Sequence, residues 1–354
     1  MKCLDRYIAT QVLSSIFVVL MVVLALNFVF AYMDEIKDTT ATYNSPIILK
    51  YLFLRVPGSL YEFLPLSSLV GCLVGLGMLA SHSELTVMRA AGISTLRIIM
   101  SVIKPALLLA FLSMAAGEFL VPVTEQLAQS TKAKATGGGK ALQSQFGVWH
   151  READTYIHIN AVIPGGRIQG VTRFEFDSEG ELSASSFAQT GVYIQGQWLL
   201  SDISKTTLSE NHTQVSAKPE EKWSLGLTPQ LLAALVVEPR DLAMSRLWSF
   251  GQYLSAQSLQ ADVYFFAFWS KLFQPLTVIA LVLIGILFIF GPLRSVTVGQ
   301  RIIAGVITGL LFKFIQDISG QISSVAGMSP LLAVLAPILV CLCLGAVLLY
   351  RSRV

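Results

Sequence analysis

The chain has 354 residues, of which 54% are apolar and only 13% are charged, and its formal net charge is +3. Soluble domains average about 25% charged residues, so this composition excludes an ordinary soluble protein. It predicts an α-helical integral membrane protein. A net charge this small gives no reason to expect nucleic acid as a partner.

Six apolar segments approach the ~20 residues that a helix needs to cross a bilayer. Four contain no charged residue, namely 12–33, 63–80, 272–290 and 331–350. The other two, 98–120 and 302–325, contain charged groups that need an explanation. Segment 12–33 is too long for the core of a signal peptide, so we expect it to be retained as an anchor.

The segments divide the chain into three predicted domains. Residues 1–121 hold three transmembrane helices and a cytoplasmic loop at 81–92, residues 122–262 form an external domain, and residues 263–354 hold three more helices. Basic residues gather in the termini and short loops of one side: Lys2, Arg6, Arg89, Arg97, Arg294, Arg301, Arg351 and Arg353. The positive-inside rule then places both termini in the cytoplasm and the inserted domain on the outer side of the membrane.

The external domain has the pattern of an antiparallel β structure. Short runs alternate polar and apolar residues at 156–162, 170–176 and 192–203, and turn residues occur at 164–166 and 177–180. This pattern predicts a sandwich or roll, preceded by a helical stretch at 125–134 and followed by an amphipathic helix at 242–254. All four cysteines lie in or beside membrane segments, so we expect no disulfide framework.

Two membrane segments carry small-residue motifs. Gly71 and Gly75, and likewise Gly305 and Gly309, are spaced four residues apart. Such spacing favours close helix packing, with a hinge as the alternative.

Catalytic and nucleotide-binding motifs are missing from the sequence. Gly137 to Lys140 has the wrong spacing for a phosphate-binding loop and lacks the following Ser or Thr. His150 and His158 could meet on adjacent strands, but a role on the strand surface fits better than a metal site. We therefore expect no catalytic residue, no metal and no cofactor bound by this chain.

The predicted cytoplasmic loop at 81–92 contains a short helix. Ser81 and Glu84 have the spacing of a capping box, Leu85 and Met88 share one face, and Gly92 is a natural stop. A helix of about two turns is unstable alone, so it must pack on the membrane segments or on a partner protein. Glu84 either caps its own helix or contacts that partner.

Charged residues near two membrane segments suggest an anionic ligand. Lys313 lies about 16 Å along its helix from Ile302, and Asp317 follows one turn later. Lys313 either pairs with Asp317 or snorkels to the interface, or it faces a cavity. Lys37, at the outer end of the first segment, lies at the height of a lipid head group in the outer leaflet.

Several runs in matching topological positions resemble the LptF/LptG family of lipopolysaccharide export permeases, and most closely its LptG members. The resemblance covers the whole chain and rests on residues 4–8, 75–80, 83–85, 91–92, 269–271, 274–275 and 288–296.

The resemblance implies a permease subunit with six transmembrane helices and a periplasmic β-jellyroll. It would extract lipopolysaccharide from the outer leaflet of the inner membrane of a Gram-negative cell. Implied partners are an LptF permease, two LptB ATPase subunits that bind ATP and Mg²⁺, and LptC and LptA, which carry the lipid towards the outer membrane.

The resemblance also implies roles for individual residues. It assigns contact with the ATPase to Glu84, and the neighbouring candidates are Ser83, Leu85, Met88 and Arg89. Lys37 matches a basic position near the lipid phosphates of relatives. Candidates on the fifth span are Lys313, Phe312, Gln316 and Asp317, and candidates for a groove in the jellyroll are Ile157 and Ile159.

Two other classes of function deserve comparison. A membrane receptor or sensor with a periplasmic ligand-binding domain would need a cytoplasmic signalling module, for which the cytoplasmic segments are too short. A membrane enzyme acting on lipids would need clustered acidic or histidine residues near a membrane face. The sequence contains no such cluster.

Overall fold

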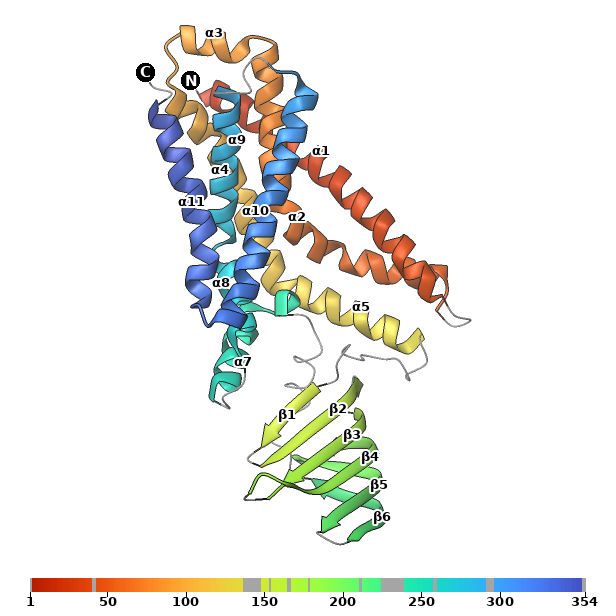
Figure 1. Cartoon of the computed structure of the whole chain (residues 1–354). Coiled ribbons are helices and arrows are strands. Elements are labelled where there is room, and N and C mark those ends of the chain that lie inside the picture. Colours follow the sequence, from red (N-terminus) through yellow and green to blue (C-terminus); the bar gives the residue numbers. More distant parts are fainter. Residues whose placement is uncertain are drawn as a thin grey trace. The chain divides into compact units, whose positions relative to one another are not determined.

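A computed structural model describes residues 2–39, 43–135, 148–152, 154–163, 167–177, 179–209, 212–223, 239–256, 260–290 and 296–351 (Figure 1). The chain forms two compact units. The first, which we call the helical unit, comprises Met1–Asp34, Arg55–Thr124 and Ala243–Val354. The second, the sheet unit, comprises Glu35–Leu54 and Glu125–Leu242.

The helices account for the apolar composition of the chain. Their bounds are α1 Lys2–Glu35, α2 Ser45–Ser81, α3 Glu84–Ala90, α4 Thr95–Phe119, α5 Val121–Ala135, α7 Met244–Ala256, α8 Asp262–Leu272, α9 Gln274–Phe290, α10 Val298–Ala326 and α11 Pro330–Arg351. Among the described residues, α1, α2, α4 and α10 are long and apolar enough to cross a membrane. If the bent pair α8 and α9 is one span, the number of such crossings rises from four to five. The prediction of a helical membrane protein is confirmed.

Helix α2 is much longer than the apolar segment 63–80 that predicts it. It begins at Ser45 and contains Pro57 and Pro65. Its first half carries Lys50, Arg55 and Glu62, which lower the local hydropathy and hide the helix from a search for apolar runs.

The break between α8 and α9 lies at Phe273, where the two helices meet at 59°. Pro275 explains it, because its ring lacks an N–H and clashes with the carbonyl four residues earlier. Lys271, beside the break, is only 4% exposed. Its Nζ donates to Gly117 O at 3.4 Å and lies 5.5 Å from the centre of the Tyr61 ring.

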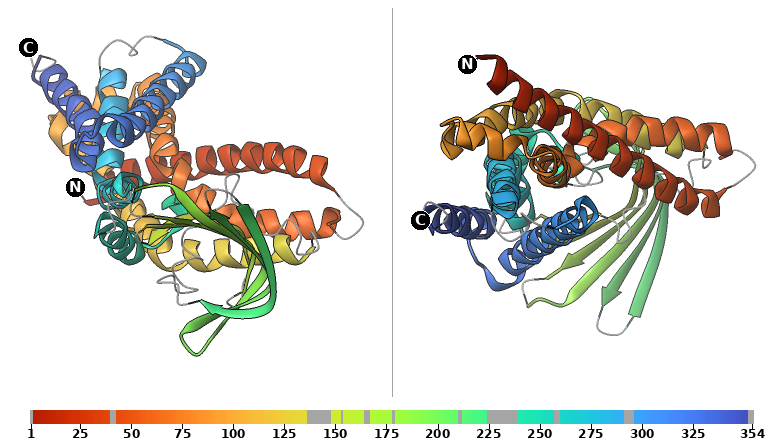
Figure 2. Two further views of the ribbon diagram at one scale, coloured as in Figure 1. Left: turned by 60° about the horizontal axis from the view of Figure 1, so that its bottom comes forward. Right: turned by 90° about the horizontal axis from the view of Figure 1, so that it is seen from above.

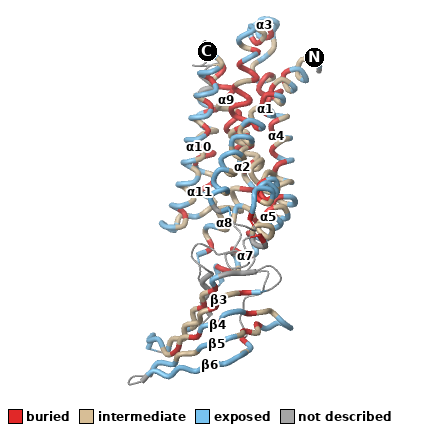
Figure 3. The backbone as a smooth tube through the Cα atoms, turned by 90° about the vertical axis from the view of Figure 1, so that its right-hand side faces the viewer, coloured by how far each residue is buried: buried red, intermediate tan, exposed pale blue. Residues whose placement is uncertain are grey.

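Glycines let the helices of the helical unit pack backbone against side chain. A Cβ atom at Gly71 would collide with the backbone of Ile16 on α1. Gly305 and Gly309 on α10 are covered by the side chains of Leu73 and Leu66 of α2. The packing interpretation of both small-residue motifs is confirmed. Figure 3 shows the buried stretches of these helices in red.

The sheet unit contains one antiparallel sheet of six strands in sequential order. The strands are β1 Val148–Glu152, β2 Thr155–Ile163, β3 Arg167–Phe176, β4 Leu182–Ile194, β5 Gln197–Ser209 and β6 His212–Trp223. Figure 2 shows that the sheet is strongly curved. The antiparallel prediction is confirmed, and so is the turn after Asp177, whose Oδ1 accepts from the backbone N–H groups of Glu179 and Glu181.

The predicted run 192–203 is wrong as a single strand. It is a hairpin in which Ile194 pairs with Gln197 across Gln195 and Gly196. Both turn residues have positive φ, 50° and 86°, as a two-residue hairpin loop requires. The predicted turn at 164–166 lies outside the described residues.

The apolar core of the sheet lies on one face because the strands share an irregularity. Residues three apart, which point to opposite faces in a regular strand, are buried together here. They are Ile168 with Val171, Ala188 with Gly191, and Leu200 with Ile203. Gly170 and Asp202, at the same level of the sheet, have φ of 65° and 56° and reverse the alternation there. The apolar side chains on the two sides of the irregularity therefore share one face.

Candidate functional site

The loop helix α3 begins two residues later than a capping box would place it. Ser83 is the N-cap residue, in a left-handed conformation with φ 61° and no side-chain cap. Ser81 ends α2 instead, and its hydroxyl donates to Met78 O at 2.8 Å. The capping box was therefore a wrong prediction. The stop at Gly92, with φ 84°, is confirmed.

Helix α3 packs on the other helices of the helical unit through two residues that share its inner face. Leu85 and Met88 are 4% and 8% exposed and join the core with Ile8 of α1 and Ile98 of α4. Arg89 is exposed and Glu84 is half-buried. In Figure 1, α3 lies at the same end of the helical unit as the first turn of α1 and the last turn of α11.

Glu84 bonds to another helix instead of capping its own. The hydroxyl of Tyr7 on α1 donates to Glu84 Oε2 at 3.0 Å. Sequence reasoning missed Tyr7, although it lies inside the run 4–8 that carries part of the family resemblance. One edge of the α3 surface is thus tied to α1.

A second polar contact ties α1 to α4. Arg97 donates from Nε and Nη2 to the two carboxylate oxygens of Asp5, at 2.9 and 2.8 Å. The Ser101 hydroxyl donates to Asp5 Oδ1 at 3.3 Å. A bidentate pair fixes orientation as well as distance. The start of α1 is therefore held from α3 and from α4, which flank it.

Lys313 forms an ion pair with a residue of α2. Its Nζ is 2.7 Å from Glu62 Oε1, and the two side chains are 41% and 37% exposed. The predicted alternative of a pair with Asp317 is therefore wrong. Asp317 is exposed and Gln316 half-buried, whereas Phe312 is 6% exposed and packs in the helical core.

Lys37 belongs to the sheet unit and is exposed in the short helix Ile36–Asp38. The neighbouring Glu35 is held by Lys132 of α5, whose Nζ lies 2.7 and 2.8 Å from its two carboxylate oxygens. The buried Tyr43 donates to the same carboxylate at 2.9 Å. These polar contacts fix the position of Glu35, two residues before Lys37.

The two groove candidates are both in the sheet core. Ile157 and Ile159 on β2 are 1% and 0% exposed, and they pack on the apolar face with Val171 and Ile203. Among the residues that the structure describes, no group of three His, Cys, Asp or Glu side chains could hold a metal ion.

Comparison with known proteins decides the family. The sequence model described as "Lipopolysaccharide export system permease LptF/LptG" matches residues 6–351. The chain belongs to the LptF/LptG family. Every candidate residue discussed above except Asp5 falls inside the matched range of this LptF/LptG chain.

The curated relatives are similar to this LptF/LptG chain over nearly its full length. A protein of Escherichia coli K12 named lipopolysaccharide export system permease protein LptG is 33% identical over 339 residues, which is 94% of each chain. A Haemophilus influenzae protein of the same name is 32% identical over 353 residues, or 99% of each chain. The resemblance to LptG members is thus confirmed.

Proposed function

We propose that this chain is a permease subunit that moves lipopolysaccharide out of the inner membrane. The observation that carries the proposal is the family match over residues 6–351, together with similarity to proteins named LptG. The described structure supports it, since it combines apolar helices with a sheet that carries an apolar core on one face.

The proposed architecture has six membrane crossings and a periplasmic jellyroll. Helix α11 serves as the sixth crossing, and the bent pair α8 and α9 as the fourth. We place the first turn of α1, the last turn of α11 and α3 in the cytoplasm, together with both chain termini. These elements lie at one end of the helical unit (Figure 1), and the positive-inside rule favours the cytoplasm for the basic residues near them. The curved sheet is the described part of the jellyroll, in the domain 122–262.

The energy for transport comes from a partner. The chain has no phosphate-binding loop, so ATP and Mg²⁺ are bound by a separate ATPase of the LptB type, present in two copies. We place its docking surface on α3, where Leu85 and Met88 anchor the helix and Glu84, Ser83 and Arg89 lie at its surface. Glu84 is the coupling residue, because its contact with Tyr7 leads directly to a membrane helix.

A lipid path follows from the cost of exposing acyl chains, about 0.8 kcal/mol per CH₂ group. The lipid must pass from the bilayer to a covered apolar surface. Lys313, paired with Glu62, and the exposed Lys37 are candidates for contact with its anionic groups. The face that holds Ile157 and Ile159 would receive its acyl chains.

The remaining partners complete the route. The second permease is an LptF subunit, and the lipid passes from the jellyroll to LptC and then to LptA. Lipopolysaccharide itself is the substrate, and the chain carries no cofactor of its own.

Copurification from native membranes tests this proposal. A tagged copy of the chain should bring down a cytosolic ATPase and a second, similar permease in defined proportion. Replacing exposed Val87 and Arg89 of α3 by Asp and Glu should remove the ATPase and keep the second permease. Retention of an ATPase by that variant, or absence of one from the unaltered chain, would contradict the proposal.

A further inference from the structure

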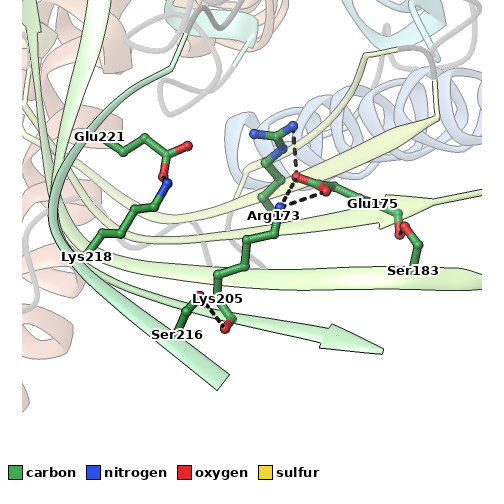
Figure 4. A network of polar contacts seen from close by, with 7 residues as sticks. All are labelled: Arg173, Glu175, Ser183, Lys205, Ser216, Lys218 and Glu221. Carbon is green, nitrogen blue, oxygen red and sulfur yellow. Dashed lines mark hydrogen bonds and ion pairs between the residues drawn. The ribbon is translucent and has the colours of Figure 1, made fainter. Parts of the chain in front are cut away.

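A charged cluster lies on the same face of the sheet as the apolar core. It consists of Arg173, Glu175 and Lys205 (Figure 4). The register places Arg173 between Ile157 and Ser186, and Ser186 beside Lys205. Directly opposed residues of an antiparallel sheet project from one face. Because Ile157 is part of the buried core, the cluster belongs to the apolar face.

The cluster has more positive than negative groups. Arg173 Nη2 lies 2.9 Å from Glu175 Oε1, and Lys205 Nζ lies 3.1 Å from Glu175 Oε2. The guanidinium carbon of Arg173 is 5.0 Å from the centre of the Trp223 ring. One carboxylate thus holds two cations in fixed positions, and one positive charge is left over.

The cluster also marks the place where the apolar face meets water. The Arg173, Glu175 and Lys205 side chains are 31%, 22% and 36% exposed. Their apolar neighbours Ile157 and Trp223 are only 1% and 4% exposed. Two residues along a strand cover about 7 Å, so the cluster and the apolar core are close enough for one amphiphile to contact both.

We propose that Arg173 and Lys205 bind a phosphate group of lipopolysaccharide while its acyl chains lie on the apolar face. The inference rests on the proposed function and adds a site for the head group in the sheet unit. Guanidinium and ammonium groups are suited to phosphate, because their hydrogen bonds to it are charge-assisted and Arg can bind in a bidentate manner. Glu175 keeps both cations oriented before the lipid arrives.

A purely structural role would leave a different signature. The cluster joins β3 to β5, and partly exposed ion pairs of this kind add little to stability. If that were its only role, neutral variants would change the melting temperature slightly and leave lipid contact unaltered. A measurement of lipid contact therefore separates the two roles.

The test is photo-crosslinking in the assembled complex with bound lipopolysaccharide. A photoreactive residue at position 216 lies on the cluster's face, because Ser216 pairs with Lys205. The same residue at position 204 lies on the opposite face and is the negative control, since Ser204 stands between Ile203 and Lys205 along β5.

Replacing both cations, R173Q with K205Q, should lower capture at position 216 by about tenfold, because two charge-assisted contacts are lost. K222Q, on the exposed edge strand, should leave it unaltered, and K205R should retain most of it. For lipid stripped of its phosphates, the double variant and the unaltered chain should capture equally.

Equal capture of phosphorylated lipid by the unaltered chain and the double variant would overturn the inference. If the double variant does not assemble, K205Q alone must still lower capture. The proposed function fails separately, if no ATPase and no second permease copurify with the unaltered chain.

Discussion

The hydroxyl of Tyr7 donates a hydrogen bond to Glu84 Oε2 at 3.0 Å, across 77 positions of sequence. It links the loop helix α3 to α1, while the Asp5 and Arg97 pair links α1 to α4. A displacement of α3 by a bound ATPase would therefore reach a membrane helix through a polar contact.

Removing the Tyr7 hydroxyl should loosen the coupling of ATP hydrolysis to lipid transport. The variant Y7F keeps the ring and loses the bond, so transport per ATP hydrolysed should fall, and fall less than in Glu84→Ala. The variant with both changes should resemble Glu84→Ala alone, because both act on one contact. Additive losses in proteoliposome assays would contradict a shared role.

Exchanging the charges of Asp5 and Arg97 should restore the yield of folded protein that either single change lowers. Asp5→Arg and Arg97→Asp each place like charges at the junction of α1 and α4, and should lower the yield of folded protein in the membrane. The double exchange re-forms the pair and should recover much of that yield. The yield of folded protein is measured from size-exclusion profiles in detergent. If the double exchange does not recover it, the bidentate geometry, and not the pairing of opposite charges alone, holds the junction of α1 and α4.

A methyl group at Gly71 should destabilise the packing of α1 on α2. Its Cβ would meet the backbone of Ile16, so G71A should cost about 1–3 kcal/mol, the usual range for overpacking. Gly299, in the first turn of α10, has open space around its Cβ position, so G299A is the matched control. Thermal unfolding in detergent should show a lower midpoint for G71A only.

Releasing Lys313 from Glu62 should increase its contact with anionic lipid. In E62Q the carboxylate charge is lost, and a photoreactive residue at position 316 should capture more lipopolysaccharide. K313Q should capture less, with or without E62Q. D317N is the control, because Lys313 pairs with Glu62 and not with Asp317. Equal capture by the unaltered chain, E62Q, K313Q and the double variant would remove Lys313 from the proposed route.

Local patterns in the sequence predict the membrane class and two of the six strands, β2 and β3. Apolar runs and polar-apolar alternation arise directly from burial on helices and sheets, so β2 and β3 match their predicted runs closely. The hairpin at Gln195 and Gly196 was missed because alternation continues across it, although Gly196 marks the turn.

The contacts that build the site could not be predicted in the same way. Tyr7 with Glu84 and Lys313 with Glu62 join residues 77 and 251 positions apart. The periodicity of polar and apolar residues in the sequence does not reveal such a pairing, because the pairing depends on how whole helices pack. The sequence identified Glu84 and Lys313 as unusual, and the fold supplied their partners.

The most direct test of the account is ATP-driven release of lipopolysaccharide from proteoliposomes that contain the assembled complex. Complexes with the unaltered chain, or with exposed Thr86 of α3 replaced by Ala, should release lipid to a periplasmic acceptor only when ATP is present. Glu84→Ala should insert and assemble normally but release about tenfold less, the equivalent of about 1.4 kcal/mol. Release at the full rate by Glu84→Ala, or equal release without ATP, would contradict the account.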